Sequence, residues 1–435
     1  MNKDSKNILI TGFALFSIFF GAGNLIFPPT LGFVAGDKWI WIMVGFLLTC
    51  ISLPLIGIIS VAVCGGTTDK LTSKVSNNFG KILCSIIMLS IGPMFCIPRT
   101  GATTFELGVE PLFTNVSPVI VSILYFTITL IFVINESSVV DKVGTILTPF
   151  LLITLVAIIL KAIFVPMGAP INTMIDKPFS KGFTEGYQTM DAIGSIIVAQ
   201  MVIQSLIKKG YKNGKDQIRM VVKSGIISAI CLGFVYGGLV YIGSTASGVA
   251  PKDATRTGLL IFVMERLLGS SSKIIFGIAI SIACLTTAVG LTATAGNYFS
   301  KLSNGKVSYK LIVTIICIFS CAISNYGVDT IIELAVPVLV TTYPVVIVLI
   351  VMSLFDKYIK NNNIYAGAVY GALFVSIFSS LESIGINVEL VTNIINKLPF
   401  ASYGFFWIIP ALIGGLIGGV LFKGNKEELN CKKVV

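Results

Sequence analysis

The chain contains 435 residues, of which 55% are hydrophobic and 12% are charged, and its net charge is +11. A transmembrane helix uses about 20 apolar residues, so this apolar content fills on the order of twelve membrane spans. The composition therefore excludes a soluble protein. No histidine occurs in the sequence, which excludes histidine proton relays, histidine metal sites and Ser-His or Cys-His catalytic pairs.

Long apolar runs separated by short polar segments predict twelve transmembrane helices. The runs cover residues 8–35, 39–64, 80–105, 117–137, 142–165, 184–206, 221–243, 273–300, 309–325, 329–355, 364–384 and 401–422. The longer loop 244–272 contains a further predicted helix, Arg256 to Leu268, at the membrane surface. The whole chain, 1–435, is expected to form one all-α polytopic membrane domain.

The basic residues indicate how the chain is oriented. With the N-terminus inside, the inner segments carry 21 Lys and Arg residues and the outer segments carry 8. Because positively charged loops tend to stay in the cytoplasm, both termini are predicted to be cytoplasmic. The basic excess is thus explained by topology. We expect membrane lipid and a small-molecule substrate as partners, and no nucleic acid.

Two predicted spans are interrupted about 170 residues apart. The first contains Gly21-Ala22-Gly23-Asn24 followed by Pro28-Pro29, and the sixth contains the polar, glycine-bearing stretch 189–195. Each of these spans opens a group of five. Glycine and proline interruptions at corresponding positions of two halves indicate a transporter site formed by broken helices.

A break within the membrane leaves backbone groups unpaired, and these must face protein, a cavity or a ligand. At the first break, the N–H groups of Ala22, Gly23 and Asn24 can hold a carboxylate at the positive end of a helix. The carbonyls near Ser17 and Phe20 can coordinate a small cation. The alternative is a glycine-lined helix crossing or a proline kink that binds nothing.

The sequence resembles the bacterial branched-chain amino acid:cation symporters, the BrnQ-type carriers. The resemblance rests on residues 19–29 (FFGAGNLIFPP), Gly92-Pro93 with Pro98-Arg99-Thr100, residues 186–192 (GYQTMDA) and residues 284–292 (CLTTAVGLT). It implies uptake of leucine, isoleucine and valine driven by a sodium or proton gradient.

The same resemblance implies a LeuT-type fold with broken helices 1 and 6. Helices 1–5 (8–165) and 6–10 (184–355) are then inverted repeats, and helices 11–12 (364–422) are peripheral. No cofactor is implied other than the coupling ion, Na⁺ or alternatively H⁺.

The eighth predicted span carries hydroxyl groups on one face. Ala283, Thr286 and Thr287 are three and four residues apart, so two hydroxyls and a carbonyl form an oxygen surface suited to a hard cation. By resemblance, the LeuT-type fold has a sodium site here, facing the carbonyls near Ser17 and Phe20. The alternative is that the threonines bond back to carbonyls of their own helix.

Ionisable residues within the spans are costly and therefore indicate function. Asp191 at the second break is expected to hold the substrate ammonium or to organise the broken backbone. Arg99 either faces the cavity as a partner of Asp191 or of the substrate carboxylate, or extends to the outer surface near Glu106.

The predicted substrate site comprises residues from both breaks and from helix 3: Gly21, Ala22, Gly23, Asn24, Arg99, Asp191, Ala192, Ile193 and Gly194. Apolar neighbours of the breaks are weaker candidates for the side-chain pocket: Phe95, Phe105, Ile193 and Ile197. The predicted ion site comprises Ser17, Phe20, Ala283, Thr286 and Thr287.

The preferred hypothesis is a sodium-driven symporter that works by alternating access. A proton-coupled carrier that uses Asp191 or Glu106 is the alternative within the class. A membrane enzyme would require clustered catalytic groups, and a channel would require a symmetric or repeated filter. Neither pattern occurs in the sequence.

Overall fold

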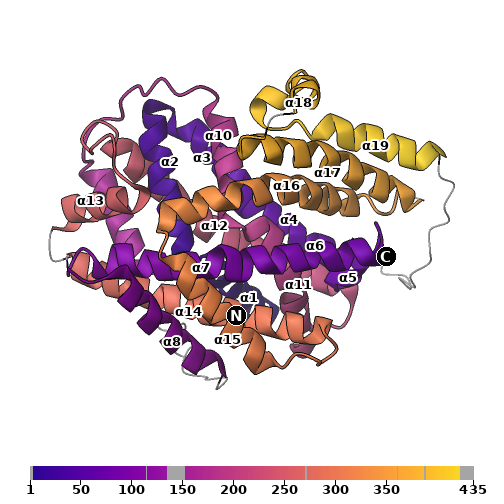
Figure 1. The fold of residues 1–435 in the computed structure, drawn as a ribbon, viewed down its shortest axis with the longest axis horizontal. Coiled ribbons are helices and arrows are strands. Elements are labelled where there is room, and N and C mark those ends of the chain that lie inside the picture. Colours follow the sequence, from indigo (N-terminus) through magenta and orange to yellow (C-terminus); the bar gives the residue numbers. More distant parts are fainter. Residues whose placement is uncertain are drawn as a thin grey trace.

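The computed structural model describes residues 3–113, 115–134, 152–269, 272–359, 361–386 and 388–421. Its regular elements are helices, which form one bundle (Figure 1). Within the described residues, seven helical stretches are long and apolar enough to cross a membrane, and four shorter apolar helices accompany them.

In chain order the elements are α1 (Lys3–Phe19), η1 (Ala22–Ile26), α2 (Phe27–Ala35), η2 (Gly36–Lys38), α3 (Trp39–Leu47), η3 (Leu48–Ser52), α4 (Leu53–Val63), α5 (Thr68–Thr72), α6 (Asn77–Leu89), η4 (Ser90–Met94), α7 (Cys96–Thr103), η5 (Thr104–Val109), α8 (Pro118–Ile134), a helix over Leu152–Phe164, α10 (Pro178–Glu185), η6 (Gly186–Thr189), α11 (Asp191–Lys208), α12 (Gly214–Ala246), α13 (Arg256–Leu268), α14 (Ser272–Leu302), α15 (Tyr309–Ser324), α16 (Val328–Leu354), α17 (Asn363–Ser383), α18 (Glu389–Asn396), η7 (Ala401–Tyr403) and α19 (Ile408–Leu421).

Most predicted spans correspond to these helices, and the helix predicted at Arg256 to Leu268 is confirmed as α13. Parts of the predicted spans 117–137 and 142–165 fall on residues 135–151, which lie outside the described residues. The predicted span 401–422 is too long. Its first residues form the short 3-10 helix η7, which lies between Phe400 and Gly404, both with positive φ, and α19 begins only at Ile408.

The sixth predicted span, 184–206, starts too late, and part of the predicted loop 166–183 is helical. The helix begins at Pro178, a residue suited to the first turn because it has no N–H to satisfy. Lys181 and Glu185 make this first segment polar, so hydropathy alone places it in the loop. The third span is also longer than predicted, over Asn77–Val109, and it bends at Gly92.

Two spans are discontinuous at the predicted places. The first break lies between α1 and η1, where Gly21 is extended with φ −84° and ψ 145°. The second break covers residues 186–190, where the short 3-10 helix η6 ends at Met190 in the left-handed region, with φ 59°. Each break therefore interrupts the regular backbone hydrogen bonding between two helical halves.

Glycine pairs bring the broken helices into backbone contact with their neighbours. A Cβ at Gly32 of α2 would lie 1.8 Å from the Val240 carbonyl oxygen, and one at Gly243 of α12 would lie 1.9 Å from that of Pro29. Gly45 of α3 and Gly182 of α10 form a second reciprocal pair, each 2.0 Å from a carbonyl oxygen of the other helix. Small residues permit such close crossings in membranes.

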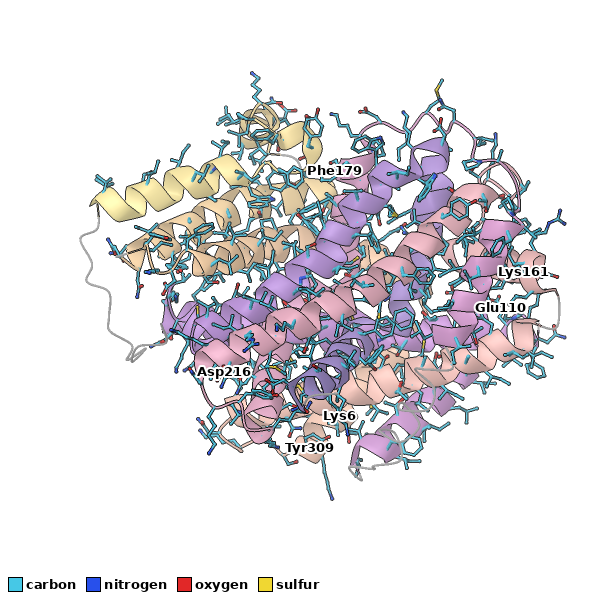
Figure 2. All side chains as sticks on the ribbon, turned by 180° about the vertical axis from the view of Figure 1, so that it is seen from behind. Lys6, Glu110, Lys161, Phe179, Asp216 and Tyr309 are labelled. Atoms are coloured by element: carbon cyan, nitrogen blue, oxygen red, sulfur yellow. The ribbon has the colours of Figure 1, made fainter. Side chains whose placement is uncertain are left out.

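The ends of the helices gather on two opposite sides of the bundle. In Figure 2, Lys6, Asp216 and Tyr309 lie toward one side, and Phe179, Lys161 and Glu110 lie toward the other. This grouping agrees with the alternation of helix ends that the sequence predicts. The α17 and α19 helices lie side by side at one edge of the bundle (Figure 1).

The Gly32 crossing provides a test of this packing. Replacing Gly32 by Ala forces α2 away from α12, and overpacking of this kind costs about 1–3 kcal/mol. We expect the Tm of the purified protein in detergent to fall by several degrees. Gly290→Ala is the matched control, because a Cβ there meets no atom within 4 Å. Equal Tm values for the two variants would contradict the backbone contact.

Candidate functional site

Side chains satisfy the backbone groups that the first break exposes. The Phe19 carbonyl oxygen, at the end of α1, accepts hydrogen bonds from Asn24 Nδ2 at 3.1 Å and from the Tyr236 hydroxyl of α12 at 3.2 Å. The Asn24 N–H donates to the Gly21 carbonyl at 2.9 Å, within the turn of η1. The carbonyl that the break exposes is therefore satisfied within the protein.

The second break is organised by Thr189. Its hydroxyl donates to the Gly186 carbonyl at 2.9 Å and accepts from the Asp191 N–H at 3.4 Å. The left-handed Met190 turns the chain between η6 and α11, so Asp191 becomes the first residue of the second helical half. Its carboxylate thus lies beside a helix N-terminus, where negative charge is favourable.

One hydrogen bond joins the two breaks. Asn24 Nδ2 donates to Asp191 Oδ2 at 3.0 Å, and the Tyr236 hydroxyl lies 3.4 Å from the same nitrogen. Asn24 is buried, whereas Asp191 keeps part of its surface accessible. The structure therefore brings together two residues that the sequence placed in one substrate site.

Arg99 is directed into the bundle. It is 3% exposed, its Nη1 donates to the Gln188 carbonyl at 2.9 Å, and its guanidinium lies 5.2 Å from the centre of the Phe27 ring. The alternative that Arg99 extends to the outer surface is wrong, because it lies on α7, midway along the bent third span, and points toward the second break.

Open space adjoins both breaks. Gly194 is buried, yet a Cβ built on it meets no atom within 4 Å, and the same holds for the part-exposed Gly21. Nearby on the second broken span, Gln188 Oε1 and the Tyr187 hydroxyl are buried without a well-formed hydrogen bond among the described residues. Open space and unsatisfied polar atoms thus both occur on the second broken span, and a small polar ligand requires both.

The apolar candidates differ in accessibility. Ala192 and Ile193 are fully buried and Phe95 is 5% exposed, whereas Phe105 and Ile197 keep part of their surface accessible. The first three pack in the core in this conformation. Their assignment to a side-chain pocket stays a prediction.

The candidate ion ligands fall into two groups. On α14, the Thr286 and Thr287 hydroxyls each donate to the Ala283 carbonyl at 2.9 Å. On α1, Ser17 is exposed and Phe20, just beyond its end, is buried. The α14 helix packs against η1, whereas α1 packs mainly against α12. The structure therefore does not bring α1 and the α14 threonines into one closed site.

Sequence reasoning missed Tyr236, whose hydroxyl contacts both Phe19 and Asn24. A tyrosine within the apolar run of α12 is the signal that could have found it. It also missed the polar contacts around α13 at the far end of the bundle, because Glu106, Glu185, Arg256 and Asp329 are distant from one another in the sequence.

Asn24 is the residue whose removal should disturb the breaks most. Asn24→Ala removes the hydrogen-bond donor to the Asp191 carboxylate and one of the two donors to the Phe19 carbonyl, and a hydrogen bond to a charged group contributes about 1.5–3 kcal/mol. Tyr236→Phe removes the other donor to the Phe19 carbonyl and the long contact with Asn24, but it leaves the Asn24 hydrogen bonds to Phe19 and Asp191 in place. We expect Asn24→Ala to lower the Tm in detergent clearly more than Tyr236→Phe does. The reverse order would mean that Tyr236 supports the break instead.

Comparison with known proteins identifies the family. A family model described as "Branched-chain amino acid transport protein" matches residues 4–425. The branched-chain amino acid permease BraB of Bacillus subtilis is 40% identical over 437 residues, with 98% of each chain covered. The branched-chain amino acid transport system 2 carrier protein of Pseudomonas aeruginosa is 35% identical over 414 residues, with 94% of each chain covered.

Solved transporter structures share the fold at low sequence identity. Inward-facing Mhp1 has a TM-score of 0.58 at 12% identity, over 94% of this chain and 90% of that one. A Na⁺-coupled sialic acid symporter has a TM-score of 0.59 at 15% identity, over 96% and 90% of the two chains. MhsT in complex with L-phenylalanine has a TM-score of 0.56 at 14% identity, over 95% and 97%.

These likenesses confirm the predicted all-α, LeuT-type fold of a polytopic membrane protein. The family and the named relatives are permeases and carriers, so the protein is a transporter and not an enzyme. The resemblance inferred from the sequence motifs is likewise confirmed, since the model match extends over nearly the whole chain. The chain belongs to the branched-chain amino acid transport protein family.

Proposed function

We propose that this transporter imports leucine, isoleucine and valine across the bacterial cytoplasmic membrane by sodium-driven symport, with both termini in the cytoplasm. The names of BraB and of the Pseudomonas carrier support the substrate class. The observation that carries the proposal is the Asn24–Asp191 hydrogen bond, which joins two helix breaks beside the open space at Gly21 and Gly194.

A zwitterionic substrate fits the charges at the breaks. In this proposal the part-exposed Asp191 carboxylate receives the substrate ammonium. The N–H groups of Ala22 and Gly23, at the start of η1, receive the carboxylate, where the helix dipole favours negative charge. Arg99, held at the second break by the Gln188 carbonyl, would add positive charge near this site.

The aliphatic side chain of the substrate requires an apolar wall. A pocket that distinguishes one methylene gains only about 1–3 kcal/mol. We therefore propose that leucine, isoleucine and valine all bind. Residues around the second break, including Ala192, Ile193 and Ile197, are the candidates for this wall.

Sodium binding would draw α1 toward α14. The Thr286 and Thr287 hydroxyls donate their hydrogens to Ala283, so their oxygen lone pairs stay available to a cation. The carbonyls near Ser17 and Phe20 would complete the ligand set. Because α1 now packs mainly against α12, the ion would favour a conformation in which α1 lies closer to α14.

Proton coupling through Asp191 is the second candidate. Asp191 is part-exposed and lies between the two breaks, so its protonation would alter the Asn24 hydrogen bond directly. Glu106 is less suited to this role. Both of its carboxylate oxygens accept hydrogen bonds, from Thr257 and from the Val328 N–H.

Uptake of labelled leucine by purified protein in liposomes tests the proposed function. We expect an inward sodium gradient to stimulate uptake, because ion binding and substrate binding favour the same conformation. Unlabelled isoleucine and valine should compete, and lysine should not. A pH gradient without sodium is the second arm. Stimulation by that gradient alone would assign the coupling to protons, and no stimulation by either would exclude symport.

Thr287→Ala tests the ion site. Losing one oxygen ligand should raise the sodium concentration for half-maximal leucine uptake roughly tenfold, the factor that about 1.4 kcal/mol of lost binding free energy gives. Thr294→Ala is the matched control, since Thr294 makes the same kind of bond to its own helix, at 2.8 Å to the Gly290 carbonyl. An unchanged sodium requirement in Thr287→Ala would remove Thr287 from the site.

A further inference from the structure

A polar crevice opens between the start of α1 and the start of α12, on the side of the bundle where Lys6 and Asp216 lie (Figure 2). Its volume is about 160 Å³, roughly ten times what a single water molecule needs. Polar side chains from both helices and from the loop before α12 line it: Asp4, Ser5, Tyr211, Asp216, Arg219 and Lys223. The crevice shares no residue with the proposed substrate site.

Hydrogen bonds between the two helices and the loop hold the walls of the crevice in place. The Tyr211 hydroxyl donates to Asp4 Oδ1 at 2.7 Å, and Gln217 Nε2 donates to the Tyr211 carbonyl at 3.0 Å. One turn further along α1, the Ile8 carbonyl accepts from the Ser224 hydroxyl of α12 at 3.1 Å. The crevice is therefore a formed site and not a gap between loose ends.

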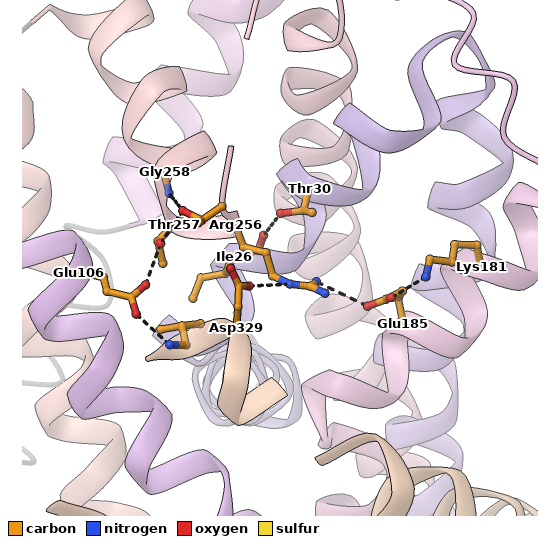
Figure 3. Close-up of polar contacts among 11 residues, drawn as sticks. Ile26, Thr30, Glu106, Lys181, Glu185, Arg256, Thr257, Gly258 and Asp329 are labelled. Atoms are coloured by element: carbon orange, nitrogen blue, oxygen red, sulfur yellow. Dashed lines mark hydrogen bonds and ion pairs between the residues drawn. The ribbon is translucent and has the colours of Figure 1, made fainter. Parts of the chain in front are cut away.

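The two basic side chains of the crevice have no acidic partner. Arg219 and Lys223 are exposed and lie one turn apart on α12, and neither makes an ion pair or a side-chain hydrogen bond with any described residue. Arg256 of α13 is different, because it lies 3.0 Å from Asp329 and 3.7 Å from Glu185 (Figure 3). The hydrogen-bond donors of Arg219 and Lys223 are thus available to a ligand.

The surroundings of the crevice are electropositive, although two carboxylates line it. Residues 3–8 and 208–223 together hold eight Lys or Arg and two Asp, which gives a net charge of +6. The Asp4 carboxylate already accepts from Tyr211. Asp216 lies in the first turn of α12, where the helix dipole favours negative charge. The charge that remains uncompensated is positive, so the crevice favours an anion.

An apolar surface begins where the basic residues end. Ile226 and Ile230 follow Lys223 by three and seven residues, which places them on the same face of α12. They are 54% and 68% exposed, and α12 is long and apolar enough to cross a membrane. A ligand that matches both parts of this face has an anionic head and hydrocarbon chains. A free phosphate ion matches the basic part alone.

We propose that the crevice binds the phosphate headgroup of an anionic phospholipid, whose acyl chains lie along Ile226 and Ile230. Arg219 donates to the phosphate oxygens in the parallel geometry that a guanidinium permits, and Lys223 adds a point charge. Basic pockets between transmembrane helices recognise headgroups of this kind. The tendency of basic residues to stay on one side of a membrane accounts for their number, but it requires no crevice lined by unpaired cations.

Native mass spectrometry of the delipidated full chain in detergent tests the proposal by measuring the Kd of dioleoyl phosphatidylglycerol. We expect tighter binding than for zwitterionic dioleoyl phosphatidylcholine. The double variant Arg219→Gln/Lys223→Gln should raise the Kd for phosphatidylglycerol at least about tenfold, since each basic group near an anionic lipid contributes about fivefold. Its Tm should stay at the wild-type value, because both side chains are exposed and unpaired.

Lys306→Gln/Lys310→Gln is the matched control. It removes two exposed lysines that flank Tyr309 on the same side of the bundle but do not line the crevice (Figure 2). We expect this variant to bind phosphatidylglycerol as the wild type does. Ser5→Trp is the second test variant, because it fills the crevice and keeps every charge, and it should also weaken binding.

Four results would overturn the lipid site. These are equal Kd values for the two lipids, an unchanged Kd in both Arg219→Gln/Lys223→Gln and Ser5→Trp, an equal loss in the lysine control, and displacement of the lipid by millimolar inorganic phosphate. The last result would assign the crevice to free phosphate. Neither leucine nor an ion gradient enters the measurement, so its outcome is independent of the proposed transport function.

Discussion

The need to satisfy backbone groups at two helix breaks is the constraint on which the rest of the structure depends. An unpaired carbonyl in a membrane costs several kcal/mol, so each break requires donors from elsewhere. Asn24 and Tyr236 supply them to the Phe19 carbonyl, and Arg99 supplies one to the Gln188 carbonyl. Asn24 and Arg99, which satisfy backbone carbonyls at the breaks, are therefore also residues of the proposed substrate site.

Because the same residues serve the breaks and the proposed site, both could be predicted in part from the sequence. Glycine at position 21, the double proline after the first break and an aspartate within an apolar run are local signals, and each marks a real feature of the structure. The bounds of α13 were likewise predicted correctly, as Arg256 to Leu268. The start of α10 at Pro178 was not predicted, because its first turns are too polar to be distinguished from the loop before them.

Other features depend on packing between distant segments. The direction of Arg99 follows from the bend at Gly92 and from the position of the second break, neither of which is visible from the residue itself. The contacts of Arg256 require α10, α13 and α16 to meet. The α13 helix makes polar contacts with α10 and α16, whereas α1 packs mainly against α12 and leaves residues such as Phe13 half exposed.

The reciprocal glycine pairs have a mechanical consequence. Gly32 with Gly243, and Gly45 with Gly182, place backbone against backbone, where no flexible side chain can absorb a displacement. The α2 and α12 helices, and the α3 and α10 helices, are thus coupled as stiff pairs. A displacement of α2 or α10 would therefore press directly on the backbone of α12 or α3.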